Sequence, residues 1–274
     1  MKEWKFSRES NPVTRIIDLG GGLTIGEKGK STLIAGPCSI ESWEQIEEVA
    51  KCLVKNNVKI IRAGCYKPRT SPYSFPGMEE EGLKLLAKIR EKYGLKIITE
   101  VKDSTQVETV LKYTDIVQIG AKAMWDYGIL KKLSKTKKPT LIKRAFGATT
   151  QEVCQIGEYL LNGGNENIMI CERGIRTFEP NSRFTLDLCG SAWIKKHTNI
   201  PLVLDPSHAM GFSYGVPELA LASIATGPSA IMIEVHPDPS VAKSDSAQQL
   251  NLDQFESLVK KIKKVAAAVD REVI

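Results

Sequence analysis

Short apolar runs alternate with longer segments of helical periodicity along most of the chain. Nearly every position in the runs is apolar and many are β-branched, which is typical of parallel strands buried on both faces. The runs predict strands over 32–37, 59–63, 96–101, 116–120, 140–144, 168–171, 202–205 and 230–235. The segments between them predict helices over 43–55, 78–93, 104–112, 127–135, 149–162, 183–196, 216–226 and 252–269.

Eight consecutive strand–helix repeats predict an α/β protein with the (β/α)8 TIM-barrel fold. A doubly wound open sheet is the alternative, but it more often has about five or six strands and needs a topological switch point, which the pattern does not show. A barrel needs ~250 residues, so residues 32–274 are expected to form one catalytic domain.

Residues 1–31 precede the first predicted barrel strand. Glycines at 20–22 and 26 interrupt apolar positions such as Ile17 and Ile25, which indicates a short β-hairpin. We expect this N-terminal extension to cap the bottom of the barrel, since about 30 residues are too few for a separate regulatory domain.

Two helix boundaries carry local signals. Thr149 followed by Glu152 predicts a capping box at a helix start. Asn162-Gly163-Gly164 predicts the end of the same helix, because glycine readily adopts the left-handed conformation found there.

Composition narrows the class of partner. The formal net charge is +6, but no run of five or more Lys or Arg occurs, so a small anionic ligand is expected rather than nucleic acid. No apolar stretch approaches the ~20 residues of a membrane span. The six cysteines form no C-x-x-C pair and follow a polar N-terminus, which predicts free thiols and a cytoplasmic protein.

The predicted carboxyl ends of the strands are rich in cations. Active sites of TIM barrels lie at these ends, and so many positive charges on one rim require an anionic ligand, such as a phosphate with a carboxylate. For any single residue an ordinary surface cation is an equal alternative. The cations are Arg62, Lys67, Arg69, Lys122, Lys143, Arg144 and Arg173.

A candidate metal site lies at the same ends. One thiol, one imidazole and two carboxylates suit a divalent metal such as Mn, Fe, Co or Zn. The candidates are Cys38, His208, Glu234 and Asp245. Cys38 or His208 alone could equally be a core residue, and His236 competes with His208 as a ligand. A nucleophile elbow, a Walker A motif and a dinucleotide fingerprint are absent from the sequence.

Several motifs in the same order resemble type I 3-deoxy-D-arabino-heptulosonate 7-phosphate (DAHP) synthases of the short beta class. They are Gly36-Pro37-Cys38-Ser39, Arg62 with Lys67-Pro68-Arg69-Thr70, Asp205-Pro206-Ser207-His208-Ala209, and Ile233-Glu234-Val235-His236-Pro237-Asp238-Pro239 with Ser244-Asp245. The resemblance covers about residues 30–265. The family is related to the 3-deoxy-D-manno-octulosonate 8-phosphate synthases, which carry a different sequence at Lys67-Pro68-Arg69-Thr70.

The resemblance implies specific roles. The metal ligands would be Cys38, His208, Glu234 and Asp245. Phosphoenolpyruvate would be held by Arg62, Lys67, Ala121, Lys122, Lys143 and Arg173, and the aldose phosphate, erythrose 4-phosphate, by Arg69 and Thr70. The implied reaction is an aldol-type condensation, at the first step of the shikimate pathway, in which a divalent metal ion polarises the aldehyde. Lys67 would donate a proton and Glu100 would orient water, alongside Cys38 and His208 as catalytic residues. The implied assembly is a homodimer or homotetramer.

Departures from the family pattern leave the aldose open. Lys122 stands where relatives usually have Arg, Trp125-Asp126 stand where Gln-Asn is frequent, and Phe212-Ser213-Tyr214 replace an Arg pair. The alternatives are an octulosonate-type or sialic-acid-type synthase, a secondary-metabolism variant, and a sugar-phosphate-binding barrel without activity.

Overall fold

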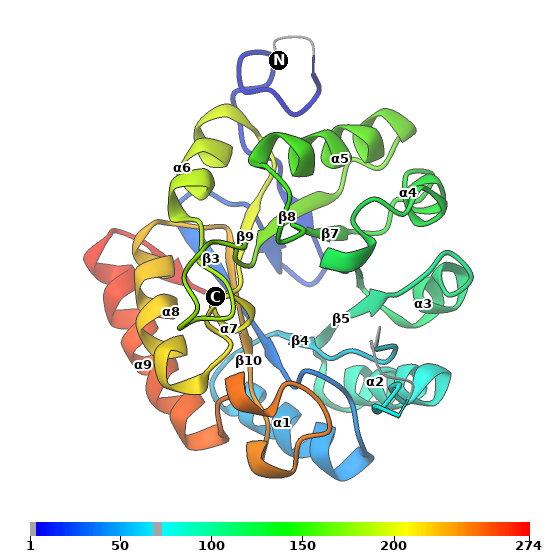
Figure 1. The fold of residues 1–274 in the computed structure, drawn as a ribbon, viewed down its shortest axis with the longest axis vertical. Helices are drawn as coiled ribbons and strands as arrows, with labels where there is room; N and C mark the ends of the chain where they lie inside the picture. Colours follow the sequence, from blue (N-terminus) through cyan, green and yellow to red (C-terminus); the bar gives the residue numbers. More distant parts are fainter. Residues whose placement is uncertain (1–3, 68–72) are drawn as a thin grey trace.

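Eight parallel strands close into a barrel in the computed structural model, which describes residues 4–67 and 73–274. Each strand pairs with the next along the chain, and the last pairs with both its predecessor and the first. Figure 1 shows the helices arranged around these strands. The barrel strands are β3 (Lys30–Gly36), β4 (Ile60–Arg62), β5 (Lys96–Val101), β6 (Ile116–Ile119), β7 (Thr140–Lys143), β8 (Ile168–Glu172), β9 (Leu202–Leu204) and β10 (Ala230–Glu234). The predicted (β/α)8 fold is confirmed.

Amphipathic helices cover the outside of the barrel. In the first of them, for example, Ile46, Val49 and Leu53 share one buried face, as the helical spacing of apolar residues requires. The covering helices are α1 (Trp43–Lys55), α2 (Glu79–Tyr93), α3 (Val107–Tyr113), α4 (Tyr127–Leu133), α5 (Thr150–Gly163), α6 (Leu188–His197), α8 (Val216–Ala225) and α9 (Leu252–Ala268). The predicted capping box of Thr149 and Glu152 is confirmed, and α5 ends on Gly164 with φ 108°.

Two helices begin later than the periodicity predicts, because side chains stabilise turns ahead of them. α3 starts at Val107 rather than 104, since Asp103 accepts hydrogen bonds from Thr105 and holds a turn. α6 starts at Leu188 rather than 183, because the Asp187 side chain caps the helix at Gly190. The residues before it belong to the long loop after β8.

One short helix, α7 (Pro206–Met210), was not anticipated from periodicity. Asp205 caps it through the His208 amide, Pro206 occupies its first turn, and Gly211 ends it with φ 77°. These are ordinary helix start and stop signals, but five residues are too few to show an apolar period. As a result His208 lies on a helix rather than at the end of a strand.

The predicted N-terminal hairpin is present, formed by β1 (Ile17–Asp18) and β2 (Thr24–Ile25). Its Ile17, Leu19 and Ile25 join a buried cluster with side chains from inside the barrel. The barrel members of this cluster include Ile34, Ile60, Ile98, Ile116, Leu141, Met169, Val203 and Met232. The hairpin therefore continues the interior core beyond the amino ends of the strands. A further strand, β11 (Glu272–Val273), pairs with the start of β3.

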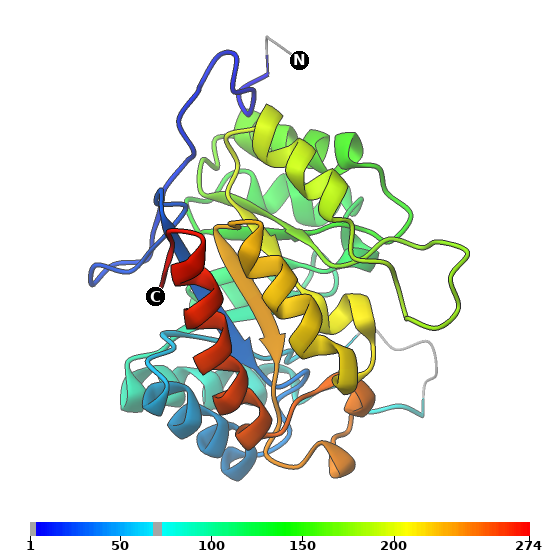
Figure 2. The same cartoon turned by 90° about the vertical axis from the view of Figure 1, so that its left-hand side faces the viewer.

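All eight strands run the same way, so their carboxyl ends face one side of the molecule. In Figure 2 the orange strand β10 points away from the end of the barrel where the N-terminal segment lies. Gly36 ends β3 with φ 150°, where a Cβ would stand 2.1 Å from the Arg62 carbonyl oxygen. Only glycine allows this approach of β3 to β4. None of the described helices is long and apolar enough to cross a membrane.

Candidate active site and metal centre

A cavity of about 280 Å³ opens at the carboxyl ends of the strands. This is the end of a TIM barrel where active sites are expected. Most of the sequence-predicted site residues line it, namely Arg62, Lys67, Glu100, Ala121, Lys122, Lys143, Arg173, His208 and Asp245. The cavity thus gathers residues from segments spread over more than half of the chain.

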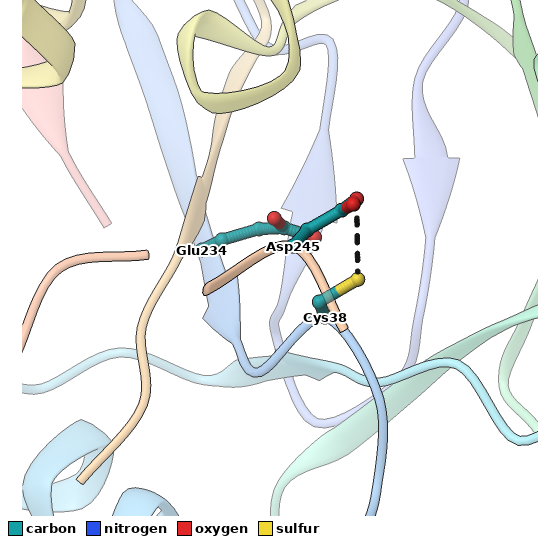
Figure 3. Close-up of side chains that lie close together, drawn as sticks. All are labelled: Cys38, Glu234 and Asp245. Atoms are coloured by element: carbon teal, nitrogen blue, oxygen red, sulfur yellow. Dashed lines mark hydrogen bonds between the residues drawn. The ribbon is translucent and has the colours of Figure 1, made fainter. Parts of the chain in front are cut away.

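A thiol and two carboxylates meet beside the cavity. Cys38 follows β3, Glu234 ends β10, and Asp245 lies in the loop after β10 with φ 46°. Their ligand atoms all lie within 4.8 Å of one another, and Figure 3 shows the Cys38 Sγ and Asp245 Oδ2 atoms facing each other at 3.5 Å. The left-handed backbone of a non-glycine residue such as Asp245 is strained, and such strain concentrates at functional sites.

Lys67 binds the thiol of this cluster. Its Nζ lies 2.9 Å from Cys38 Sγ and 3.1 Å from the Cys38 carbonyl oxygen. Burial raises the pKa of Cys38 to about 12, reinforced by the Glu234 carboxylate and only partly offset by Lys67. The raised pKa keeps the sulfur protonated near neutral pH even beside the Lys67 ammonium, and a metal ion bound there would displace this proton.

His208 reaches the cluster through Glu234. Its Nε2 lies 3.4 Å from Glu234 Oε1, while its Nδ1 lies 2.8 Å from Asp205 Oδ2 and 3.3 Å from Lys143 Nζ. Lys143 could donate only to an unprotonated Nδ1, but Asp205 is the nearer partner and favours a proton there, which leaves the Nε2 lone pair for a metal ion. Burial lowers the pKa of His208, the Asp205 and Glu234 carboxylates oppose this shift, and metal binding requires the neutral imidazole.

His236, the competing candidate, faces elsewhere. Its Nδ1 accepts a hydrogen bond from the Asp238 amide, and its Nε2 lies 3.7 Å from Glu41. Neither histidine belongs to the mutually close group of Cys38, Glu234 and Asp245, but His208 Nε2 lies 3.4 Å from Glu234 Oε1. Between the two histidines, the geometry favours His208.

The buried carboxylates stay ionised. Burial alone would raise their pKa values, but His208 and Lys143 hold the pKa of Asp205 well below its usual range. Likewise His208 and Arg62 lower the pKa of Glu234, and His208 and Arg183 lower that of Asp245. The site therefore offers negative oxygen ligands over the physiological pH range.

The residues fit a divalent cation. Glu234 is fully buried, and its Oε1 has no aligned hydrogen bond, although Arg62 Nη1 lies 2.8 Å away as an ion pair. Its other oxygen accepts a hydrogen bond from Gln248. A buried carboxylate oxygen that lies near a thiol and an imidazole, with an ion pair but no hydrogen bond, suits a metal ligand.

Arg173 is a buried cation without an acceptor. Only 4% of the residue is exposed, and neither its Nε nor its Nη1 makes a hydrogen bond within the described residues. Its guanidinium stacks on Phe184, with Cζ 4.4 Å from the ring centroid, and Phe184 stacks in turn on Phe146. Leaving buried donors unpaired costs about 1–3 kcal/mol each, so the arrangement indicates an anion that supplies the missing acceptors.

Glu100 and Gln118 also line the cavity. Gln118 donates a hydrogen bond of 2.6 Å to Glu100 Oε2. A Cβ at Gly120 would lie 2.6 Å from the Glu100 carboxyl carbon, so glycine is required for this carboxylate to stand against the end of β6. The amide leaves the second oxygen, Oε1, able to accept from a ligand or a water molecule.

Comparison with known proteins identifies the family of the chain. The profile of the DAHP synthetase I family covers residues 10–271. The chain belongs to this family. Phospho-2-dehydro-3-deoxyheptonate aldolase of Thermotoga maritima is 43% identical over 274 residues, spanning 100% of this chain and 80% of the relative.

Solved structures of the DAHP synthase family superimpose closely. A crystal structure of the Thermotoga maritima DAHP synthase has a TM-score of 0.96 at 42% identity and covers 100% of this chain and 80% of that one. A truncated form of the Thermotoga maritima synthase has a TM-score of 0.91 at 40% identity and covers 98% of each chain. A second group of relatives is also similar: 2-dehydro-3-deoxyphosphooctonate aldolase of Fusobacterium nucleatum is 34% identical, over 92% of this chain and 95% of its own.

Three residues predicted at the rim are not among the described residues that line the cavity. Arg144 does not line the cavity but pairs with Glu172 and Asp187 at 2.9 and 2.8 Å, and so ties the loops after β7 and β8 together. Arg69 and Thr70, which family resemblance assigns to the aldose phosphate, lie outside the described residues.

Sequence reasoning missed several residues of the site. Arg183 lines the cavity and donates to Gln248 at 2.9 Å, and Gln248 reaches both Glu234 and Asp245. Asp205 was named only as part of a motif. For Arg183 and Gln248 no local pattern points to the site, because Arg183 lies in the loop before α6 and Gln248 in a single 3₁₀ turn after β10. For Asp205 the Asp-Pro pair after a strand was a usable sign of a helix cap.

Proposed function

We propose that this chain catalyses the condensation of phosphoenolpyruvate with erythrose 4-phosphate and water to DAHP and inorganic phosphate. The observation that carries the proposal is the buried guanidinium of Arg173, unpartnered beside the cavity that Lys67 and Lys143 also line. Membership of the DAHP synthetase I family supports the same reaction. A dianionic phosphate with a carboxylate would supply the acceptors that the cavity lacks.

The residues proposed to bind phosphoenolpyruvate are Arg62, Lys67, Ala121, Lys122, Lys143 and Arg173. Arg62 and Lys143 are held by buried ion pairs with Glu234 and Asp205, both at 2.8 Å. These pairs set the direction of the two cations before substrate arrives. Arg173 and Lys122 have no such carboxylate among the described residues, and are therefore free to neutralise the phosphate.

The proposed metal ligands are Cys38, His208, Glu234 and Asp245. A divalent ion bound there, such as Mn, Fe, Co or Zn, would polarise the aldehyde oxygen as a Lewis acid. The soft thiolate with imidazole and carboxylates suits a transition metal better than Mg or Ca. The Asp205 carboxylate holds the His208 imidazole in the tautomer that binding requires.

Lys67 is the proposed proton donor. In the reaction, C3 of phosphoenolpyruvate forms a bond to the aldehyde carbon, and the aldehyde oxygen becomes a hydroxyl by taking a proton. Lys67 Nζ stands at the cavity wall beside the Cys38 sulfur, within reach of an oxygen held there. Glu100 is proposed to orient the water that adds at C2, after which phosphate leaves by cleavage of its C–O bond.

The main alternative keeps this chemistry and changes the aldose phosphate. Octulosonate-type relatives at 34% identity support it, as do the departures at Lys122 and Trp125. Lys67-Pro68-Arg69-Thr70 favours erythrose 4-phosphate. A phosphate-release assay with erythrose 4-phosphate and arabinose 5-phosphate side by side separates the two, and faster turnover of the second would overturn the proposed substrate.

Metal dependence is tested separately. Treatment with a chelator is expected to abolish turnover, and Mn²⁺ to restore it. The Cys38→Ser variant is expected to lose at least tenfold in metal affinity, measured as bound metal by mass spectrometry. Cys154→Ser, which alters a fully buried thiol on α5, is the matched control and should keep its metal. Full activity of chelated wild-type protein would contradict a metal-dependent reaction.

Two wider expectations stay proposals. Family resemblance supports a homodimer or homotetramer. The six cysteines are all free, which supports a reducing, cytoplasmic setting.

A further inference from the structure

A second cavity, of about 480 Å³, lies at the opposite end of the barrel. It is bounded by the N-terminal arm, the end of α6, the turn after α8 and the residues just before β11. Figure 2 shows the N-terminal arm running past α6 at the end from which β10 starts. None of the residues proposed to take part in the reaction lines this cavity.

Four cations line the second cavity, and the three that are partly buried form no ion pair among the described residues. Within residues 4–67 and 73–274, Arg8, Lys195 and Arg271 hydrogen bond only to backbone oxygens and hydroxyls. Arg8 donates to the backbone carbonyl oxygen of Lys195 at 2.7 Å, which ties the N-terminal arm to the end of α6. Lys195 donates to the Thr226 carbonyl oxygen with one of its three N–H groups.

The carbonyl partners offset only part of this charge. The ends of α6 and α8 carry about −0.5 of an elementary charge each, so together they balance about one of the three positive charges. Glu27, the one carboxylate among the described residues that line the cavity, is already paired with Lys30 at 2.7 Å. Burial lowers the pKa of Lys195, and the nearby Arg271 lowers it further, which is what an uncompensated pair of cations produces. About two positive charges are left without a counter-ion.

The remaining wall is apolar and partly open. Val13 and Ile16 are 76% and 53% exposed, and Ile200 and Leu202 lie deeper. Partly buried cations beside exposed apolar side chains suit a ligand with a charged head and an apolar body. A residual charge of about two matches a phosphate monoester, which carries about −1.5 to −2 at pH 7.

We propose that this cavity binds a small organic phosphate monoester, with its phosphate between Arg8, Lys195 and Arg271 and its carbon skeleton against Val13 and Ile16. Arg271 Nη1 makes no hydrogen bond to a described residue, and Lys195 has two further donors, so acceptors on the ligand have partners at hand. Lys28, exposed on the lining, adds a further positive charge at the entrance.

The test is isothermal titration of phenyl phosphate, inorganic phosphate and benzoate into the full chain. Phenyl phosphate is expected to bind at least tenfold more tightly at this site than either of the other two, since each of them lacks one half of the complementarity. Lys195→Gln should weaken that binding at least tenfold. Lys196→Gln removes the same charge from the exposed neighbour on α6 and should bind as the wild type does. Phosphate bound in the cavity at the carboxyl ends of the strands contributes equally in the wild type, Lys195→Gln and Lys196→Gln, so it does not affect the comparison.

Two further measurements keep the result decisive. If Lys195→Gln lowers the melting temperature, Lys28→Gln, which alters an exposed side chain, should still weaken binding about two- to threefold. A crystal structure with phenyl phosphate should show it against Arg271. Equal affinities for Lys195→Gln and Lys196→Gln, or phenyl phosphate found only at the barrel top, would overturn the proposal.

Discussion

The Nζ of Lys67 lies 2.9 Å from the Sγ of Cys38, so the proposed proton donor and the proposed thiolate ligand are in direct contact. The Cys38 thiol is fully buried. Its sulfur contacts the Asp245 carboxylate and the Lys67 ammonium among the described residues. One side chain therefore touches both the cluster of metal ligands and the substrate cavity. This contact leads to the first prediction.

Replacing Lys67 by Ala is expected to lower kcat about 10²- to 10⁴-fold, the usual contribution of a general acid. Lys67→Arg keeps the charge but has a far higher pKa, and should restore substrate binding more than turnover. Steady-state phosphate release measures both variants. Near-normal turnover of Lys67→Ala at saturating substrate would remove Lys67 as the proton donor.

The carboxylate of Asp205 supports both sides of the site, since its Oδ2 lies 2.8 Å from Lys143 and 2.8 Å from His208. Asp205→Asn keeps a helix cap for α7 but removes the charge. We expect metal affinity to fall about 10- to 100-fold, as for other groups that orient a metal-binding histidine. Because Lys143 then loses its buried partner, stability should also fall, by about 3–5 kcal/mol.

Metal titration and urea unfolding of Asp205→Asn separate the two effects. An unchanged metal affinity in a folded Asp205→Asn protein would show that the proton on His208 is set by something other than Asp205.

The ring of Phe184 holds the guanidinium of Arg173 in place. Losing a cation–π contact costs about 0.5–2 kcal/mol, so Phe184→Leu should raise the KM for phosphoenolpyruvate about three- to thirtyfold with little change in kcat. Phe184→Tyr keeps the stacking face and should behave as wild type. Phe178→Leu, at a side chain in the same loop that is 99% exposed, is the matched control. An equal KM in Phe184→Leu and Phe178→Leu would mean that the stack does not position Arg173.

Glu47 links α1 to α2 through Lys92 and Tyr93, at 2.5 and 3.0 Å. The hydrogen bond from Lys92 is the main cause that lowers the pKa of Glu47 to about 2, against 4.5 for an unperturbed glutamate. Because the folded pKa is depressed, the stabilisation is present above pH 4.5 and is lost as pH falls toward 2. Glu47→Gln should therefore have a lower melting temperature than wild type at pH 7, and the gap should narrow at pH 3.

Thermal unfolding of both proteins at pH 7, 4.5 and 3 tests this. Glu91→Gln, an exposed glutamate on α2 without an ion pair among the described residues, should show no such gap. A gap for Glu47→Gln that stays constant with pH would rule out the ionised carboxylate as its source.

The order of elements and the rim chemistry could be predicted from sequence. Continuous apolar strands such as Ile168–Glu172 can be buried on both faces only in a sheet covered by helices, and eight repeats leave a closed barrel as the natural arrangement. Since parallel strands end on the same side, Arg62, Lys143 and Glu234 had to meet there whatever the loops did. The short helix α7 was not predicted, because five residues are too few to show a helical period of apolar positions, although its Asp205 cap is visible in the sequence.

What the sequence by itself determined is the barrel, the side on which the chemistry gathers and the residue types available to it, because these depend on local periodicity and strand direction. Only the tertiary structure decided which groups touch. It placed His236 beside Glu41, paired Arg144 with Glu172 and Asp187, and brought Arg183 from a loop and Gln248 from a short 3₁₀ turn to the carboxylates. Loop residues have no regular period that fixes their direction, so their contacts follow from packing and charge pairing across the whole molecule rather than from neighbours in the chain.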